Sequence, residues 1–382
     1  MKFEINKALS LMSPFIVMEM LERAQKMEAN GETIIHFEVG EPDFNIPQSA
    51  KKAIETAANQ GHTHYTHSLG LIELREEVAK HYFKEYGVSI SSEQVMITSG
   101  SSAGILMIIK LLCGVNDEVI ISNPGYACYA NFLHACNVKP VEVNVFGENN
   151  FQFNIEDLKS AITPRTKAII LNSPMNPSGA LVSDEVYKAV SELGIPLISD
   201  EIYHGLVYDE KIKSALNFSA DAIVINGFSK RWAMTGLRLG WIITPKELIR
   251  PLQILQQNLF ICATTLSQYA GIEALKDSFN ETEAMRMMYK ERRDYMMIRL
   301  NEMGIKLATK PQGAFYIFCD IRNLTSDSYA FCLDVLNNAK VAITPGIDFG
   351  TNGEGFIRFS YATSLENIKE GMDRLERYLK RE

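Results

Sequence analysis

Short apolar runs alternate with helix-like stretches between residue 48 and about residue 245 of this 382-residue chain. This alternation restricts the fold more than any other feature, because it is typical of βαβ units. Such units form a largely parallel sheet that is covered by helices on both faces. The predicted strands are Val95–Thr98, Glu118–Ser122, Val141–Val145, Lys167–Leu171, Leu197–Ser199 and Ala222–Ile225. The helices predicted between them are Ala103–Leu112, Ala127–His134, Ile155–Ala161 and Asp184–Glu192.

Beyond this region the pattern changes. Residues Lys246–Lys290 have no strand pattern and are predicted to form a long helix, and an α+β pattern follows from Tyr295. We therefore expect an α/β fold with a mostly parallel sheet in a large domain, residues 48–290. A smaller α+β domain is expected from both termini, residues 1–47 and 291–382. Its predicted elements are Pro14–Ala29, Ile34–Val39, Gly313–Cys319, Ser328–Asn338, Gly355–Tyr361 and Leu365–Arg381.

Charge and composition exclude several classes of protein. The chain has 38 Lys and Arg against 46 Asp and Glu, and a net charge of −8 argues against a nucleic-acid partner. No apolar run reaches the ~18 residues of a membrane helix, and the N-terminus has no signal core. Six scattered cysteines without a Cys-x-x-Cys pair fit reduced thiols in the cytoplasm. The nearby His62, His64 and His67 have no cysteine or carboxylate cluster beside them, so no metal site is expected.

Lys230 stands after a predicted strand, in the stretch Asn226-Gly-Phe-Ser-Lys230, and Arg238 follows eight residues later. A lysine amine can form a Schiff base with a carbonyl. The hydroxyl of Ser229 and the guanidinium of Arg238 suit a phosphate, because both donate hydrogen bonds to it. Pyridoxal phosphate requires this combination of groups. Taken alone, Ser229-Lys230 also fits a solvated surface lysine, so the interpretation depends on the rest of the chain.

Further polar motifs stand where other strands end, which is the edge at which parallel sheets bind ligands. Thr98-Ser-Gly-Ser-Ser102 opens a helix whose N–H groups can bind an anion. Asn123-Pro-Gly-Tyr126 can place an aromatic ring over a flat ligand. Each motif also has a structural explanation, as a Ser- and Gly-rich turn or as a tyrosine packed at a turn.

Three more motifs offer donors and charges. Ser173-Pro-Met-Asn-Pro-Ser-Gly179 fixes an asparagine amide between two prolines. Asp200 can pair with a pyridinium nitrogen, although a helix N-cap is the alternative, and Tyr203 can donate to the phenolic oxygen of the same ring. Arg358 lies in an apolar strand, where burial requires a partner, and a substrate carboxylate is the fork-shaped partner that arginine prefers.

In this order the motifs resemble those of the pyridoxal-phosphate-dependent aminotransferases of fold type I, class I/II, and the resemblance runs nearly end to end. Lys230 resembles the catalytic lysine that forms the Schiff base, and Asp200 the partner of the pyridine nitrogen. Tyr203 and Asn176 resemble the donors to the phenolic oxygen, and Tyr126 the stacking ring.

The resemblance also implies a phosphate site and a substrate site. Gly40, Asn176 and Arg358 match the substrate contacts, with Arg358 on the α-carboxylate. Tyr65 resembles the tyrosine that reaches the phosphate of a neighbouring subunit, which implies a homodimer with shared active sites. The residues that match the phosphate site within one chain are Ser101, Ser102, Ser229 and Arg238.

The implied reaction is reversible amino-group transfer between an L-amino acid and a 2-oxo acid such as 2-oxoglutarate or pyruvate. Ser102 stands where some aspartate-type members have a lysine, and Leu255–Leu266 lacks the Lys or Arg that others use. Neutral or broad specificity is therefore expected, with a strict aspartate aminotransferase as the alternative.

Two other functions are compatible with parts of this sequence. A β-eliminating C–S lyase uses the same fold, but Tyr203 and the residues after Lys230 favour the transferase. The ligand-sensing module of a transcription factor is disfavoured, because only about 12 residues precede the first predicted helix.

Overall fold

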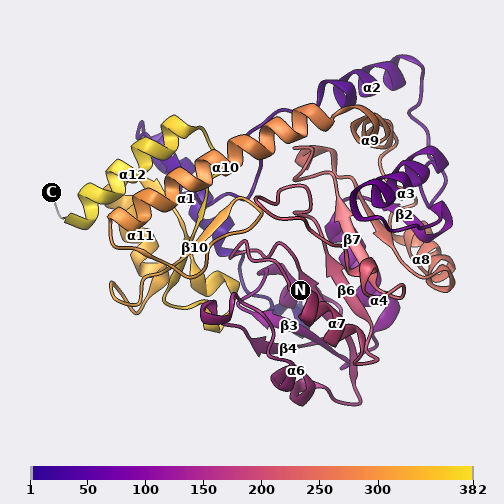
Figure 1. Ribbon diagram of the computed structural model, residues 1–382, viewed down its shortest axis with the longest axis horizontal. Helices are drawn as coiled ribbons and strands as arrows, with labels where there is room; N and C mark the ends of the chain where they lie inside the picture. The colour runs from indigo at the N-terminus through magenta and orange to yellow at the C-terminus, as the bar shows by residue number, and fades with distance from the viewer. Residues whose placement is uncertain (1–2, 381–382) are drawn as a thin grey trace.

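A seven-stranded sheet forms the centre of the larger part of the molecule (Figure 1). The computed structural model describes residues 3–380, and its strand order in this sheet is β2-β8-β7-β6-β5-β3-β4. Neighbouring strands are parallel except for β8, which is antiparallel to both β2 and β7. The strands are β2 (Val95–Thr98), β3 (Glu118–Asn123), β4 (Lys139–Asn144), β5 (Thr166–Asn172), β6 (Leu197–Asp200), β7 (Ile223–Gly227) and β8 (Gly240–Ile243).

Helices cover both faces of this sheet. Adjacent strand residues such as Met96 and Ile97 belong to two separate hydrophobic clusters, because successive side chains point to opposite faces. One cluster includes residues of α4, α5 and α8, and the other includes residues of α3, α6, α7 and α9. The helices of this part are α2 (Gln48–Asn59), α3 (Ile72–Tyr86), α4 (Ser101–Leu112), α5 (Cys128–Ala135), α6 (Ile155–Ala161), α7 (Asp184–Ser191), α8 (Lys246–Leu259) and α9 (Thr265–Asp277).

The predicted α/β fold is confirmed, and the six predicted strands and four helices of the large sheet region lie within two residues of their observed bounds. Two predictions for this region were incomplete. Strand β8 was not predicted, and Lys246–Lys290 holds α8, α9 and the start of α10 rather than one long helix. Ile261, between α8 and α9, has a φ of 67°, a left-handed conformation that no α-helix contains.

The smaller part combines both ends of the chain around a hydrophobic cluster that includes Phe37, Ile317 and Phe359 and extends to Tyr203 and Leu206 of the larger part. Its antiparallel sheet has the order β12-β13-β10-β9, and β1 pairs in parallel with β11. The predicted residue Arg381 of the last helix lies outside the described residues. The elements are α1 (Ile16–Ala29), β1 (Ile35–His36), β9 (Lys306–Leu307), β10 (Tyr316–Asp320), α11 (Ser328–Ala339), β11 (Val341–Ala342), β12 (Thr344–Pro345), β13 (Phe356–Ser360) and α12 (Leu365–Lys380).

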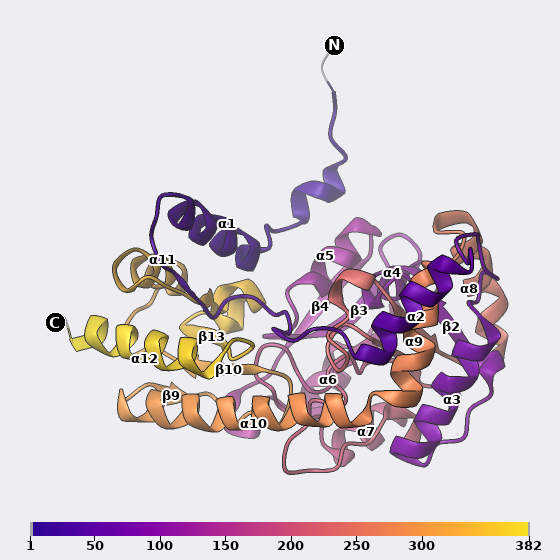
Figure 2. The same cartoon turned by 90° about the horizontal axis from the view of Figure 1, so that it is seen from above.

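Helix α10 (Phe279–Glu302) runs alongside both parts of the molecule in Figures 1 and 2. The predicted domain boundary between residues 290 and 291 falls inside this helix, so the division into two domains stays a prediction. In Figure 2 the chain before the short 3₁₀-helix Lys7–Leu11 projects outward, whereas Ser13, which follows that helix, exchanges two hydrogen bonds with Asn131 of α5. No helix within residues 3–380 is long and apolar enough to span a membrane.

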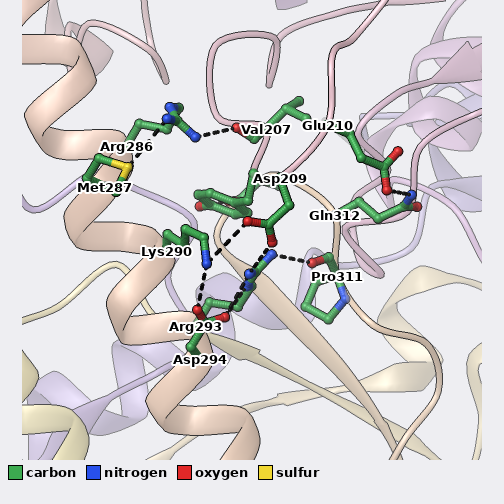
Figure 3. A network of polar contacts seen from close by, with 12 residues as sticks. Val207, Asp209, Glu210, Arg286, Met287, Lys290, Arg293, Asp294, Pro311 and Gln312 are labelled. Atoms are coloured by element: carbon green, nitrogen blue, oxygen red, sulfur yellow. Dashed lines mark hydrogen bonds and ion pairs between the residues drawn. The ribbon is translucent and has the colours of Figure 1, made fainter.

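A polar network joins α10 to the loop that follows β6 (Figure 3). Arg293 is 1% exposed and donates hydrogen bonds to the Asp209 carboxylate at 2.9 Å and to the Pro311 carbonyl at 3.0 Å. Its guanidinium lies 4.7 Å from the centre of the Tyr208 ring. Lys290 pairs with the same aspartate at 3.2 Å. These contacts fix the loop against the helix.

Candidate active site

A cavity of about 320 Å³ lies at the carboxyl ends of the parallel strands. Asp200 is the last residue of β6, Lys230 follows β7, and Ser101 follows β2. Every predicted site residue except Tyr65 lines this one cavity. These residues are Gly40, Ser101, Ser102, Tyr126, Asn176, Asp200, Tyr203, Ser229, Lys230, Arg238 and Arg358.

The amine of Lys230 points into the cavity and donates a hydrogen bond to the carbonyl of Gly40 at 2.6 Å. Burial, aided by the positive charges of Arg358 and Arg238, lowers the pKa of this amine to about 8, while Glu41 acts in the opposite direction. A lower pKa leaves more of the amine neutral near physiological pH, and only the neutral amine is a nucleophile or a base.

Asp200 is buried, and both of its carboxylate oxygens have partners. Tyr129 donates to Oδ2 at 2.6 Å, and the backbone N–H of Ile202 donates to Oδ1 at 3.1 Å. Burial raises the pKa of Asp200, whereas the two hydrogen bonds and the charge of Lys230 favour the ionised form. The carboxylate is therefore fixed in position and could hold a protonated ring nitrogen.

Arg358 is 2% exposed and is held by three distant segments. Its guanidinium donates to Asn176 Oδ1 at 2.9 Å and to the carbonyl of Glu38 at 2.6 Å. The rings of Tyr316 and Phe349 lie 4.2 and 4.9 Å from it. Its buried Nε has no partner among the described residues. An unpaired donor of this kind is costly, and a ligand carboxylate could satisfy it.

A second group of cavity residues forms a site suited to an anion. Ser101 and Ser102 are the first residues of α4, where free backbone N–H groups and the helix dipole attract negative charge. Arg238 adopts a left-handed φ of 47° and lies so close to Gly100 that a Cβ there would be 2.6 Å from its guanidinium. With the Ser229 hydroxyl, these groups could hold a phosphate.

Three tyrosines surround the space between these two ends. Tyr203 shares a hydrogen bond of 2.8 Å with Tyr316, and its ring lies 5.9 Å from the Lys230 amine. Tyr126 lines the same cavity and makes an edge-to-face contact with Tyr129 at 5.2 Å. The cavity therefore offers an aromatic ring for stacking and a phenol for hydrogen bonding.

Tyr65 is not brought to this cavity. Its side chain is 79% exposed on the loop between α2 and α3. Within one chain it does not line the cavity that holds the other predicted site residues.

Sequence reasoning missed several groups that the structure places here. Tyr316 lies in the stretch Gly313-Ala-Phe-Tyr316, which was assigned only a strand role. Tyr129 stands three residues after Tyr126, and that short spacing was its only signal. The N-terminal residues Phe15, Val17 and Met18 also line the cavity, and nothing in their sequence indicates it.

The residues fit pyridoxal phosphate on chemical grounds. They provide an amine of lowered pKa, a fixed carboxylate, an anion site at a helix N-terminus and a ring for stacking, which are the groups that this cofactor uses. The unpaired Nε of Arg358 leaves a donor for the substrate.

Comparisons with known proteins agree over nearly the whole chain. The family profile described as aminotransferase class I and II matches residues 32–375. A relative from Methanocaldococcus jannaschii, named (5-formylfuran-3-yl)methyl phosphate transaminase, is 41% identical over 98% of this chain and 99% of its own. Aromatic-amino-acid aminotransferase 2 from Thermococcus litoralis is 37% identical over 98% of each chain. The aspartate aminotransferase of Thermus thermophilus, solved with maleate, superposes with a TM-score of 0.94 at 32% identity, covering 98% of this chain and all of that one.

The fold and the cavity thus define a pyridoxal-phosphate-dependent enzyme of fold type I. Within that class, the chain belongs to the aminotransferases of class I and II. It is a transaminase whose substrates are amino acids and oxo acids, as the sequence predicted. The relatives described above are all transaminases, which favours transfer over β-elimination.

Proposed function

We propose that this aminotransferase transfers amino groups between a broad range of neutral L-amino acids and a 2-oxo acid such as 2-oxoglutarate or pyruvate. The placement of positive charge in the cavity carries the proposal. Lys230, Arg238 and Arg358 are the cationic side chains that line it among residues 3–380. Each has a role with the cofactor or the α-carboxylate, so none of these described cations is left for the side-chain carboxylate of aspartate. Use of 2-oxoglutarate as acceptor requires another polar group for its second carboxylate, whereas pyruvate has no such requirement.

The remaining lining supports the same specificity. Phe15, Val17 and Met18 contribute apolar side chains, and Glu41 contributes a carboxylate whose oxygen accepts a hydrogen bond from Thr235. A carboxylate in the cavity lining disfavours an acidic substrate side chain, because like charges repel in a partly buried site. The aromatic-amino-acid relative agrees with this proposal, whereas the aspartate enzyme represents the alternative.

The cofactor roles proposed for the cavity residues follow from their positions. Ser101, Ser102, Ser229 and Arg238 bind the phosphate, and Tyr126 stacks on the ring. When bound, pyridoxal phosphate supplies a carbonyl for the amine and a ring that takes up the electrons released at Cα. Asp200 keeps the ring nitrogen protonated. Asn176 and Tyr203 donate to the ring oxygen; Asn176 uses its NH2 group, because its Oδ1 accepts from Arg358.

The substrate roles depend on three groups. Arg358 binds the α-carboxylate, and the Glu38 carbonyl and Asn176 hold its guanidinium in one plane. Lys230 removes the proton from the substrate Cα as a general base and later acts as a general acid. Gly40 orients the lysine through its carbonyl oxygen, and its lack of a Cβ makes room for the Tyr316 hydroxyl.

A homodimer with shared sites completes the proposal. Tyr65 is exposed, and so are Ile72, Leu259 and Ile261, large apolar side chains that favour a protein contact. In the dimer, Tyr65 donates to the phosphate of the partner subunit.

We also propose that residues 48–290 form the large domain and that residues 1–47 and 291–382 form the small one. A cytoplasmic location is proposed as well, because the six free cysteines would stay reduced there.

A panel of amino donors tests the specificity. Alanine, methionine, phenylalanine and aspartate would be compared by kcat/KM with 2-oxoglutarate and with pyruvate as acceptors. We expect neutral donors to compete well with aspartate. A preference for aspartate over every neutral donor by about 10³-fold, roughly 4 kcal/mol, would refute the proposal. The aldehyde that names the Methanocaldococcus relative belongs in the panel as a further acceptor.

A further inference from the structure

We propose that Tyr129 is a positioning residue of the transamination site. Its hydroxyl fixes the Asp200 carboxylate and its ring supports Tyr126, so one side chain sets the place of two groups that contact the cofactor ring. This inference rests on the roles proposed above for Asp200 and Tyr126, and it adds a residue that does not itself line the cavity.

The position of Tyr129 limits what its hydroxyl can do. The residue lies in the first turn of α5, is 3% exposed, and donates to Asp200 Oδ2 at 2.6 Å. The other carboxylate oxygen accepts the backbone N–H of Ile202, a donor that does not depend on a side chain. Without the Tyr129 hydroxyl, Oδ2 would lose its hydrogen bond, and the Asp200 carboxylate would be held through Oδ1 alone.

The hydroxyl also affects the charge of the carboxylate. Burial favours the neutral acid at Asp200, and a neutral acid cannot hold a proton on the ring nitrogen. The groups that favour the ionised form are Tyr129, the Ile202 N–H and the more distant Lys230. Burial raises the pKa of Tyr129 well above its usual value, so the phenol keeps its proton and stays a donor.

The aromatic ring has a separate effect. The rings of Tyr126 and Tyr129 meet edge to face at 5.2 Å with an interplanar angle of 86°. This is a preferred geometry for an aromatic pair. Tyr129 belongs to the hydrophobic cluster on the α4 and α5 face of the sheet, which includes Ile105 and Leu133. The cluster holds Tyr129 in place, and Tyr129 in turn holds the stacking ring.

Removal of the hydroxyl alone tests the first effect, because Tyr129→Phe keeps the ring and the packing. Tyr187→Phe is the matched control: Tyr187 is also buried, and its hydroxyl lies 3.4 Å from Ser199, the neighbour of Asp200, rather than on Asp200 itself. Affinity would be measured by titrating the apoproteins with pyridoxal 5′-phosphate and with pyridoxamine 5′-phosphate. The second compound has no carbonyl for Lys230, so it reports on ring and phosphate contacts alone.

We expect Tyr129→Phe to weaken binding of both compounds about tenfold, the usual effect of losing a hydrogen bond to a charged group. The visible absorbance of the bound cofactor should titrate at a higher pH, because a ring that loses its nitrogen proton withdraws fewer electrons from the attached groups. A purely structural role would leave that titration unchanged. Tyr187→Phe should stay within about twofold of the parent protein.

Asp200→Asn separates failure of the inference from failure of the proposed function. If Asp200→Asn leaves cofactor binding unchanged, the role of Asp200 is wrong, and the role of Tyr129 is wrong with it. If Asp200→Asn weakens binding but Tyr129→Phe matches the parent protein in affinity and titration, only the inference is overturned. The double variant should bind about as weakly as Asp200→Asn alone, because both changes remove one interaction. Fully additive losses would contradict the inference.

Discussion

At the scale of one residue, Arg358 is the side chain that we propose to bind the substrate α-carboxylate. Two of its nitrogens are bonded to protein acceptors, and the third is buried without a partner. We predict that Arg358→Lys lowers kcat/KM by an amount equivalent to about 2–5 kcal/mol of activation free energy, because a lysine cannot replace the planar fork of the guanidinium. The loss should be similar for alanine, phenylalanine and aspartate, since all share the α-carboxylate. Steady-state kinetics on the three donors checks this, and a loss restricted to aspartate would assign Arg358 to the side chain instead.

Lys230 gives a prediction on pH. Its amine has a pKa of about 8 in the protein without cofactor, so it is protonated below that pH and neutral above it. The rate at which pyridoxal phosphate attaches to the apoprotein should therefore rise with pH and level off above about pH 8, because only the neutral amine reacts. Stopped-flow absorbance measures this rate. Lys230→Ala should form no linkage that borohydride can reduce, and a rate that is independent of pH would contradict the prediction.

Whether a site residue could be predicted from the sequence depends on whether its place comes from the strand order or from tertiary packing. Asp200, Lys230 and Ser101 could be predicted because they directly follow strands, and parallel strands end at one edge of a sheet. Tyr129 and Tyr316 could not be predicted, because their importance comes from hydroxyl contacts with Asp200 and Tyr203 that only tertiary packing creates.

At the scale of secondary-structure elements, strands that alternate with helices were predicted well, and elements that break this alternation were not. Strand β8 is as long as β2 and β6, but only the short 3₁₀-helix Thr235–Leu237 separates it from β7, so the alternation of strands with helices does not indicate it. The break between α9 and α10 is a single residue, Ser278, without a glycine or proline to mark it. Tertiary packing decides both, and local propensity does not.

The polar network on α10 predicts that substitutions of Arg293 and of Asp209 lower the free energy of unfolding by different amounts. Arg293 is buried, whereas the Asp209 side chain is 43% exposed. Arg293→Ala should lower the free energy of unfolding by about 1–3 kcal/mol, because it leaves the Pro311 carbonyl without its partner and removes packing on Tyr208. Asp209→Asn should cost under about 1 kcal/mol, as expected for an exposed ion pair. Thermal melts of the holoenzyme compare the two, and equal effects would show that the ion pair, rather than burial, dominates.

At the scale of the whole molecule, the exposure of Tyr65 predicts that one chain alone is incomplete. Tyr65→Phe and Lys230→Ala subunits should each have low activity, and mixed dimers should regain it. One site of such a dimer carries both substitutions and the other carries neither. The measurement is activity after subunit exchange, together with sedimentation to establish the dimer.

Arg358→Ala mixed with Lys230→Ala is the control for that exchange. Both residues line the cavity of one chain, so every site in the mixed dimer keeps one lesion and activity should stay low. A fully active monomer in sedimentation, or equal recovery in both mixtures, would contradict the shared site.

The pairing of β1 with β11 has a consequence for folding during synthesis on the ribosome. Ile35 pairs with Val341, so the first strand waits for a partner made about 300 residues later. At ~5–20 residues per second, that delay is roughly 15–60 s. Arg358 emerges later still, and the Glu38 carbonyl that holds it lies beside the waiting strand. The nascent chain can therefore fold its large sheet first, and the site that we propose for the substrate α-carboxylate forms only after residue 358 has been made.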